Sequence, residues 1–217
     1  MLTLKIDGTA PLSAESVKAL AALCDQAEDH TGPEIVALHV EGAPAEGWTS
    51  GLGVAAVTKW ERTLRRLERL PTPTVAVARG DCGGTALDAL LATDFRIAAA
   101  DARLLIVTDG EATWPGMAAY RLVQQAGVAA VRRALLLGLP ITAAEAASLG
   151  IVDTVADDPA SALDATVRTV TGLPGKELAI RRQLLFDATT TSFEDAIGPH
   201  LAACDRALRR TSAGAAP

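Results

Sequence analysis

The sequence predicts an α/β fold, in which a parallel sheet with crossover helices is followed by a helical C-terminal segment. Strand-like and helix-like patterns alternate from the N-terminus, the order that builds such a sheet. The runs 35–42 and 74–80 are short, apolar and rich in β-branched residues, as in strands buried on both faces. Of the 217 residues 49% are hydrophobic and only 3% aromatic, so the core must consist mainly of Ala, Leu, Val and Ile.

The first part of the chain reads as three strands separated by two helices. Period-2 alternation marks the first strand, and apolar residues three to four positions apart mark the helices. A glycine-rich loop, 43–53, precedes the second helix. In order, the predicted elements are a strand at 2–7, a helix at 15–27, a strand at 35–42, a helix at 54–70 and a strand at 74–80.

The rest of the chain reads as two short strands followed by helices. Three helical pieces are each closed by a glycine, the residue that a left-handed helix cap favours. In order, the elements are strands within 95–107 and helices at 114–127, 129–138, 142–150, 161–170 and 176–210. We expect one domain, with a core at 1–160 and a helical oligomerisation segment at 161–217.

Charge and cysteine content exclude several classes of protein. The formal net charge is -6, so no basic excess exists to neutralise nucleic-acid phosphates. The three scattered cysteines, Cys24, Cys82 and Cys204, form no disulfide framework and fit a cytoplasmic protein. The N-terminus lacks the pattern of a signal peptide, and no apolar stretch is long enough to span a membrane.

The Gly83-Gly84 turn is the feature that most directly suggests chemistry. It joins a buried strand to a helix, where free N–H groups and the helix dipole can hold a phosphate or an oxyanion. Glycine also lets a ligand approach the backbone closely. The turn fits neither a Walker loop nor the GxGxxG pattern.

The segment around this turn resembles the crotonase (enoyl-CoA hydratase/isomerase) superfamily. The family's proline-flanked strand, glycine turn, acid and Cys-Asp-x-Arg-Ile-Ala motif correspond to PTPTVAVARG, Gly83-Gly84, Asp88 and TDFRIA. Trp114-Pro115-Gly116 takes the place of the family's Ile-Pro-Gly, and residues 127–157 resemble its glycine- and alanine-patterned helical block. The resemblance covers nearly the whole chain and implies the ββα-superhelix of the ClpP/crotonase fold.

In that family, two backbone N–H groups polarise the thioester carbonyl of an acyl-CoA and stabilise its enolate. The resemblance places one donor at Gly84 or Thr85, next to Gly83. It places the other at Ala43, where the family's Phe-x-Ala-Gly-x-Asp motif is reduced to VEGAPAEGW. It implies an acyl-CoA substrate and no separate cofactor, since CoA is part of the substrate.

The two family carboxylates are altered. Asp88 takes the place of the first glutamate and Thr108 that of the second, so only one of the two usual acids remains. Because a hydratase needs two acids around one water, the resemblance points to a dehydratase-type lyase. Asp88 also fits an acid stabilised by the helix dipole, and Thr108 fits a plain turn. Thr108 and Trp114 are candidates for an acyl pocket, although core packing explains Trp114 equally well.

Other chemically active residues have simpler interpretations. The histidines, His30, His39 and His200, share no ligand spacing, so we expect no metal site. Cys82 lies beside a helix N-terminus, which can activate a thiol, but a small packed residue is the favoured interpretation. The arginines of the 54–70 helix could steer CoA phosphates, although a solvated helix face is favoured.

The short N-terminus, the reduced loop motif and the Asp88/Thr108 pair resemble one branch, the small B-type crotonase-like proteins of 3,5-dihydroxyphenylglycine biosynthesis in antibiotic pathways. That branch implies a partner, a type III polyketide synthase. The crotonase-like protein assists dehydration and aromatisation of the polyketone–CoA to 3,5-dihydroxyphenylacetyl-CoA. Two alternatives stay open: a conventional enoyl-CoA hydratase or isomerase, and a non-catalytic scaffold that stimulates a partner enzyme. The family implies a homotrimer or a hexamer.

Overall fold

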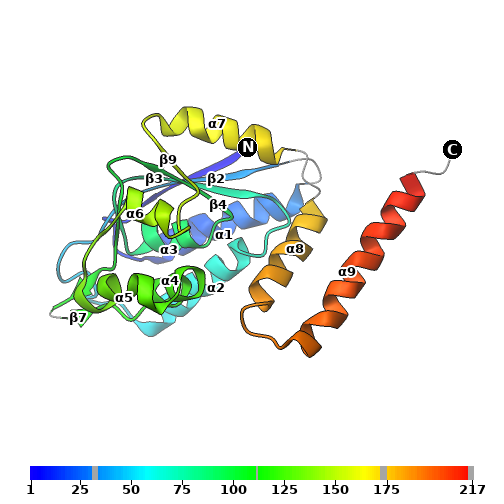
Figure 1. Ribbon diagram of the computed structural model, residues 1–217. Helices are drawn as coiled ribbons and strands as arrows, with labels where there is room; N and C mark the ends of the chain where they lie inside the picture. Colours follow the sequence, from blue (N-terminus) through cyan, green and yellow to red (C-terminus); the bar gives the residue numbers. More distant parts are fainter. Residues whose placement is uncertain (31–33, 111, 172–174, 215–217) are drawn as a thin grey trace.

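The computed structural model describes residues 1–30, 34–110, 112–171 and 175–214, and shows a parallel sheet with helices on both faces (Figure 1). Five strands run across the sheet in the order β1 (Leu2–Asp7), β2 (Val36–Gly42), β3 (Thr74–Gly83), β4 (Phe95–Ala99) and β9 (Thr154–Ala156), and all neighbours are parallel. Strand β5 (Arg103–Leu105) continues alongside the end of β3, and β8 (Ile141–Thr142) pairs antiparallel with β5. The predicted α/β class with a helical C-terminus is confirmed.

The helices complete the two layers. They are α1 (Ala14–Asp29), α2 (Val54–Leu67), α3 (Thr85–Leu91), α4 (Met117–Ala126), α5 (Val128–Leu137), α6 (Ala143–Ser148), α7 (Pro159–Val170), α8 (Gly175–Asp187) and α9 (Phe193–Gly214). Alternate residues of β2 point to opposite faces. Val36 and Leu38 therefore join the core under α1, α2 and α3, while Ala37 joins the smaller core under α7.

The structure differs from the sequence-based element list in three places. Strand β3 runs to Gly83 instead of ending at Gly80, because a positive φ of 53° at Gly80 bends the strand away from β4 and onto β5. A small antiparallel hairpin, β6 (Thr108–Asp109) with β7 (Ala112–Thr113), was not predicted. The predicted helix at 176–210 is two helices, since threonine hydroxyls at 189–191 donate to the last carbonyls of α8.

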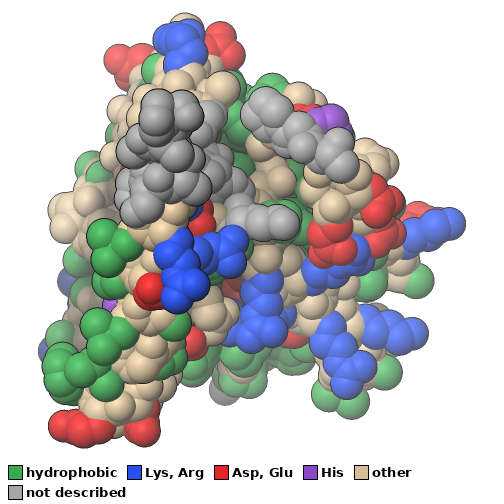
Figure 2. Space-filling model, turned by 90° about the vertical axis from the view of Figure 1, so that its right-hand side faces the viewer, with side chains coloured by type: hydrophobic (Ala, Val, Ile, Leu, Met, Phe, Trp, Pro, Cys, Tyr) green, Lys and Arg blue, Asp and Glu red, His purple; other side chains and the backbone are tan. Residues whose placement is uncertain are grey.

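Helices α8 and α9 form a hairpin that projects from the sheet (Figure 1). Arg182 fastens α8 to the body, since its guanidinium binds the Asp94 carboxylate and the backbone carbonyls of Glu68, Leu70 and Thr72. Figure 2 views this side of the molecule and shows apolar side chains at its surface. The exposed apolar residues of the hairpin are Leu185, Phe186, Phe193, Ile197, Leu201 and Leu208. Among the described helices, none is long and apolar enough to cross a membrane.

Candidate active site

The turn between β3 and α3 is tightly packed against the end of β2. A Cβ built on Gly83 would lie 2.9 Å from the Cβ of Ala43, and one on Gly84 would lie 3.1 Å from Cδ of Pro44. Gly84 also has a φ of 53° and a ψ of -128°, a conformation open essentially to glycine alone. These two glycines therefore let the loop after β2 lie directly on the start of α3.

Helix α3 leaves its first N–H group outside its own hydrogen-bond ladder. The helix begins at Thr85, and the N–H of Asp88 donates to the Gly84 carbonyl at 3.0 Å as the first helical bond. The Thr85 N–H precedes that bond, as the opening donors of any helix do. The residues predicted to hold a thioester carbonyl, Ala43 and Gly83 to Thr85, thus meet at the carboxyl ends of β2 and β3.

A mainly apolar cavity opens beside this turn. Its lining comes from the loops after β1 and β2, from α2 and α3, and from the stretch that runs from the end of β5 into α4. The lining includes Pro44, Trp48, Leu52, Val57, Trp60, Glu61, Gly84, Thr85, Leu87, Asp88, Leu105, Ile106, Val107, Trp114 and Met117. Asp88 therefore faces the same space as the Thr85 end of the helix.

Asp88 is held by a buried tryptophan. The indole Nε1–H of Trp60 donates to Oδ2 of Asp88 at 3.0 Å, and Trp60 itself is only 2% exposed. Burial and the neighbouring Glu61 carboxylate raise the pKa of Asp88 from 3.8 to about 7, against the lowering effects of Trp60 and Arg121. A carboxyl group with a pKa near neutrality can both accept and give a proton, as general acid–base catalysis requires.

Glu61 is a second carboxyl group in the cavity wall, and no motif in the sequence points to it. Its Oε2 forms an ion pair with Nη1 of Arg121 at 2.9 Å, and Nε of Arg121 donates to Glu68 at 2.7 Å. All three side chains are at most 19% exposed. In the sequence, Glu61 reads as one more polar residue on an amphipathic helix.

Trp48 contacts both Trp114 and the backbone of Thr108. Trp48 and Trp114 pack edge to face, with ring centroids 5.0 Å apart, and both line the cavity. The Trp48 indole donates to the Thr108 carbonyl at 2.8 Å. The Thr108 side chain is exposed on the β6–β7 hairpin and lies outside the cavity. Of the two acyl-pocket candidates, the structure thus places only Trp114 in this wall.

Residues 54–209 match the enoyl-CoA hydratase/isomerase family. The chain belongs to this family. It is 55% identical to an "Enoyl-CoA-hydratase" of Amycolatopsis orientalis over 96% of both chains. Its fold matches the crystal structure of an enoyl-CoA hydratase from Shewanella pealeana, with a TM-score of 0.79 and 16% identity over 95% of this chain and 84% of that one. An enoyl-CoA hydratase/isomerase structure from Marinobacter aquaeolei gives a TM-score of 0.78 with 20% identity over 99% and 89%.

Family membership confirms the predicted resemblance to the crotonase superfamily, and the protein is an enzyme of the crotonase kind. Cys82 and the arginines of α2, which the sequence predicts as a packed residue and a solvated helix face, have surroundings that fit these interpretations. Cys82 is buried, which raises the pKa of its thiol to about 12, and Sγ lies near the carbonyls of Val40 and Arg79. Arg65 and Arg66 of α2 pair with carboxylates of the protein itself. Within the described part of the chain, no three His, Cys, Asp or Glu side chains gather as metal ligands do.

Proposed function

We propose that this protein binds a polyketone–CoA thioester and assists its dehydration and aromatisation to 3,5-dihydroxyphenylacetyl-CoA, working with a type III polyketide synthase. The observation that carries the proposal is that the Gly84-Thr85 turn and Asp88 open on one apolar cavity. The thioester carbonyl would lie at the Thr85 N–H. The second donor would be the backbone at Ala43, which packs on Gly83 just outside the lining of the cavity. The reacting carbons would then lie beside Asp88.

The residues present suit this chemistry. Loss of water from a β-hydroxy thioester requires a stabilised enolate and proton transfer, and formation of the aromatic ring then drives the sequence forward. Backbone N–H groups aimed at a developing oxyanion supply the first requirement. Asp88, with a pKa of about 7, supplies a group that holds or takes a proton near neutral pH. CoA is part of the substrate, and no step calls for a separate cofactor.

Conventional enoyl-CoA hydration or isomerisation is the second candidate. The relative from Amycolatopsis orientalis, 55% identical, carries the name of that activity. Conversion of crotonyl-CoA at a rate typical of metabolic enzymes would favour this candidate. Little or no turnover of crotonyl-CoA, together with a clear rise in the synthase's share of 3,5-dihydroxyphenylacetyl-CoA, would favour the aromatisation.

The test is to incubate a dihydroxyphenylacetyl-CoA-forming type III synthase with malonyl-CoA and to follow the product profile. We expect the wild-type protein to raise the share of 3,5-dihydroxyphenylacetyl-CoA, and Asp88→Asn to remove most of that gain. Asp164→Asn is the matched control, because Asp164 is exposed on α7 and lines no part of the cavity. If both Asp88→Asn and Asp88→Ala still stimulate the synthase, the alternative of a non-catalytic scaffold that stimulates a partner enzyme would be favoured instead.

The assembly is proposed from the same family. The exposed apolar side chains of α8 and α9 support a homotrimer or a hexamer built through the C-terminal helices. Light scattering of the purified protein at micromolar concentration should give the trimer or hexamer mass, and a monomer would contradict it. The three free cysteines, two of them buried, agree with a cytoplasmic location.

A further inference from the structure

Two carboxyl groups from different helices face the active-site cavity. Asp88 comes from α3, and Glu61 comes from α2, one residue after the tryptophan that binds Asp88. The family position for a second acid holds Thr108, whose side chain lies outside the cavity. Thr108 therefore cannot supply a second acid to the cavity, whereas Glu61 has a carboxyl group in its wall.

We infer that Glu61 is a second catalytic carboxyl group, which works with Asp88 as an acid–base pair on the thioester substrate. The inference rests on the proposed function, because it assigns the second proton transfer of that reaction. It stands on the position of both carboxyl groups in one cavity wall and on the ion pair that fixes Glu61.

The surroundings divide the two groups into an acid and a base. The charged groups that face Asp88 are Glu61 from α2 and Arg121 from α4. Among the described residues, no cation forms an ion pair with Asp88, and the neutral Trp60 indole donates its hydrogen bond. Glu61 has the buried Arg121 guanidinium 2.9 Å from its Oε2, which favours the ionised form, although burial raises its pKa. The Arg121 cation beside Glu61 and the neutral indole beside Asp88 make Glu61 the base and Asp88 the acid of the pair.

The two carboxyl groups account for both proton transfers in the loss of water. The Glu61 carboxylate takes the proton from Cα, and the Cα–H electron pair becomes the enolate held at the Thr85 N–H. The enolate then expels the β-hydroxyl, whose oxygen leaves as water with the proton of Asp88. Glu61 ends protonated and Asp88 ionised, so the total charge is unchanged. Proton exchange between the two groups, or with solvent, restores the starting state.

Glu68 provides the matched control for this inference. It caps the C-terminus of the same helix and binds the same Arg121, but it does not line the active-site cavity. In dehydration of 3-hydroxybutyryl-CoA and hydration of crotonyl-CoA, we expect Glu61→Gln to lose about 100-fold or more in rate, as for loss of a general acid or base. Glu68→Gln should lose far less, with thermal unfolding checking that both variants fold. Equal losses in both variants would overturn the inference.

A titration tests the pair without any substrate. The indole N–H signal of Trp60, assigned with Trp60→Phe in ¹⁵N-labelled protein, reports the charge on Asp88 through their hydrogen bond. We expect a midpoint near pH 7 in the wild type. The midpoint should be lower in Glu61→Gln, because the neighbouring negative charge is gone, and should change less in Glu68→Gln. An unchanged midpoint in Glu61→Gln overturns the pair. If the wild type neither converts these CoA esters nor raises the synthase's share of 3,5-dihydroxyphenylacetyl-CoA, the proposed function fails, while an unchanged midpoint in Glu61→Gln would still overturn the inference by itself.

Discussion

Replacing Asp88 by Asn should make the protein more stable at alkaline pH. In the folded protein the pKa of Asp88 is about 7, against an ordinary value of 3.8. The folded state therefore binds this proton more tightly than the unfolded chain does. The stability that this gives is fully present below about pH 4 and is lost as pH rises through 7. Above pH 7 the wild type carries the whole cost of ionising a carboxyl group in this cavity, and the variant carries none.

The size of the effect follows from the same pKa. A rise from 3.8 to about 7 is roughly a thousandfold in proton affinity, or about 4 kcal/mol at 1.4 kcal/mol for each factor of ten. Asp88 is partly exposed to the cavity, and solvent there weakens the effect, so we expect about 2–4 kcal/mol at pH 8. Asn has the shape of the protonated acid and can accept the same hydrogen bond from Trp60. The difference should therefore be small near pH 4.

The assay is urea unfolding followed by circular dichroism between pH 4.5 and 8.5. The quantity of interest is the difference in unfolding free energy between Asp88→Asn and the wild type at each pH. Titrating groups that do not interact with Asp88 contribute equally to both proteins and cancel. Asp164→Asn, on exposed α7, should show no such growing difference. If Asp88→Asn is equally stable or less stable than the wild type at pH 8, the carboxylate is not destabilised by its surroundings and the reasoning is refuted.

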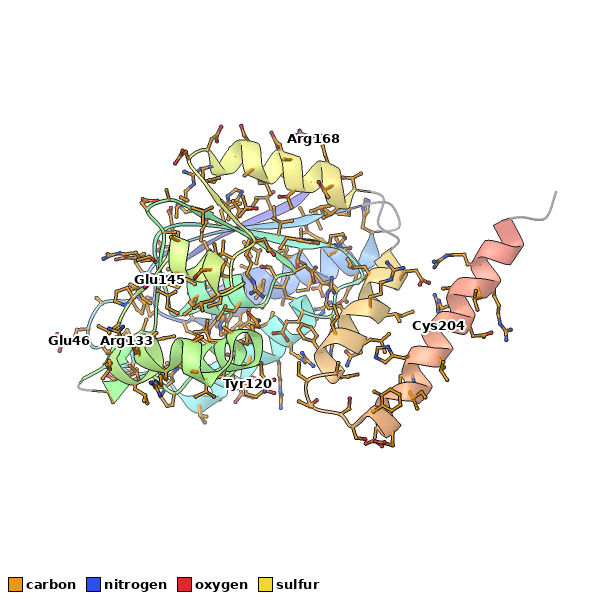
Figure 3. All side chains as sticks on the ribbon, in the orientation of Figure 1. Glu46, Tyr120, Arg133, Glu145, Arg168 and Cys204 are labelled. Atoms are coloured by element: carbon orange, nitrogen blue, oxygen red, sulfur yellow. The ribbon has the colours of Figure 1, made fainter. Side chains whose placement is uncertain are left out.

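Three further predictions concern the scaffold of the site. Gly84→Ala should lower stability by about 1–3 kcal/mol in urea unfolding and abolish activity, because Gly84 has a backbone conformation that a Cβ resists. Arg182→Ala should cost about 3–5 kcal/mol in the same assay by leaving the Asp94 carboxylate, which is only 14% exposed, without its cation, and an effect below 1 kcal/mol would contradict this. A thiol reagent should label only Cys204, which lies on the projecting α9 (Figure 3), since Cys82 and the other buried thiol have raised pKa values. Labelling of two or three cysteines in the native protein, measured by mass spectrometry, would contradict that burial.

The sequence predicts the part of the site that depends on local backbone geometry. Gly83 and Gly84 stand where a strand must turn sharply into a helix, and Asp88 follows one helical turn later, on the same side as the N-terminus. The glycine turn is short in sequence, so its pattern suffices to predict it, whereas the catalytic role of Asp88 is what the family resemblance implies. The family resemblance adds Ala43, which the parallel pairing of β2 with β3 brings beside Gly83.

Tertiary packing decides what the sequence does not show. Glu61 is 27 positions before Asp88, and the packing of α2 against α3, where Trp60 binds Asp88, brings the two carboxyl groups to one cavity. Its buried partner Arg121 comes from α4, far along the chain. No spacing rule connects three helices, so the second carboxyl group appears only in the fold. Thr108, predicted from the resemblance to the family, lies on an exposed hairpin. The two strands of this hairpin have only two residues each, too few to show a strand pattern in the sequence.

Solvent deuterium exchange tests the central claim, that this cavity stabilises an acyl-CoA enolate. Phenylacetyl-CoA and butyryl-CoA in D₂O, followed by mass spectrometry, report removal of the α-proton without any loss of water. The wild-type protein should catalyse incorporation of deuterium at the α-carbon, and Gly84→Ala, which distorts the turn before the Thr85 N–H, should lose most of that activity. Exchange no faster than in protein-free buffer, with both esters bound to the protein, would contradict the account.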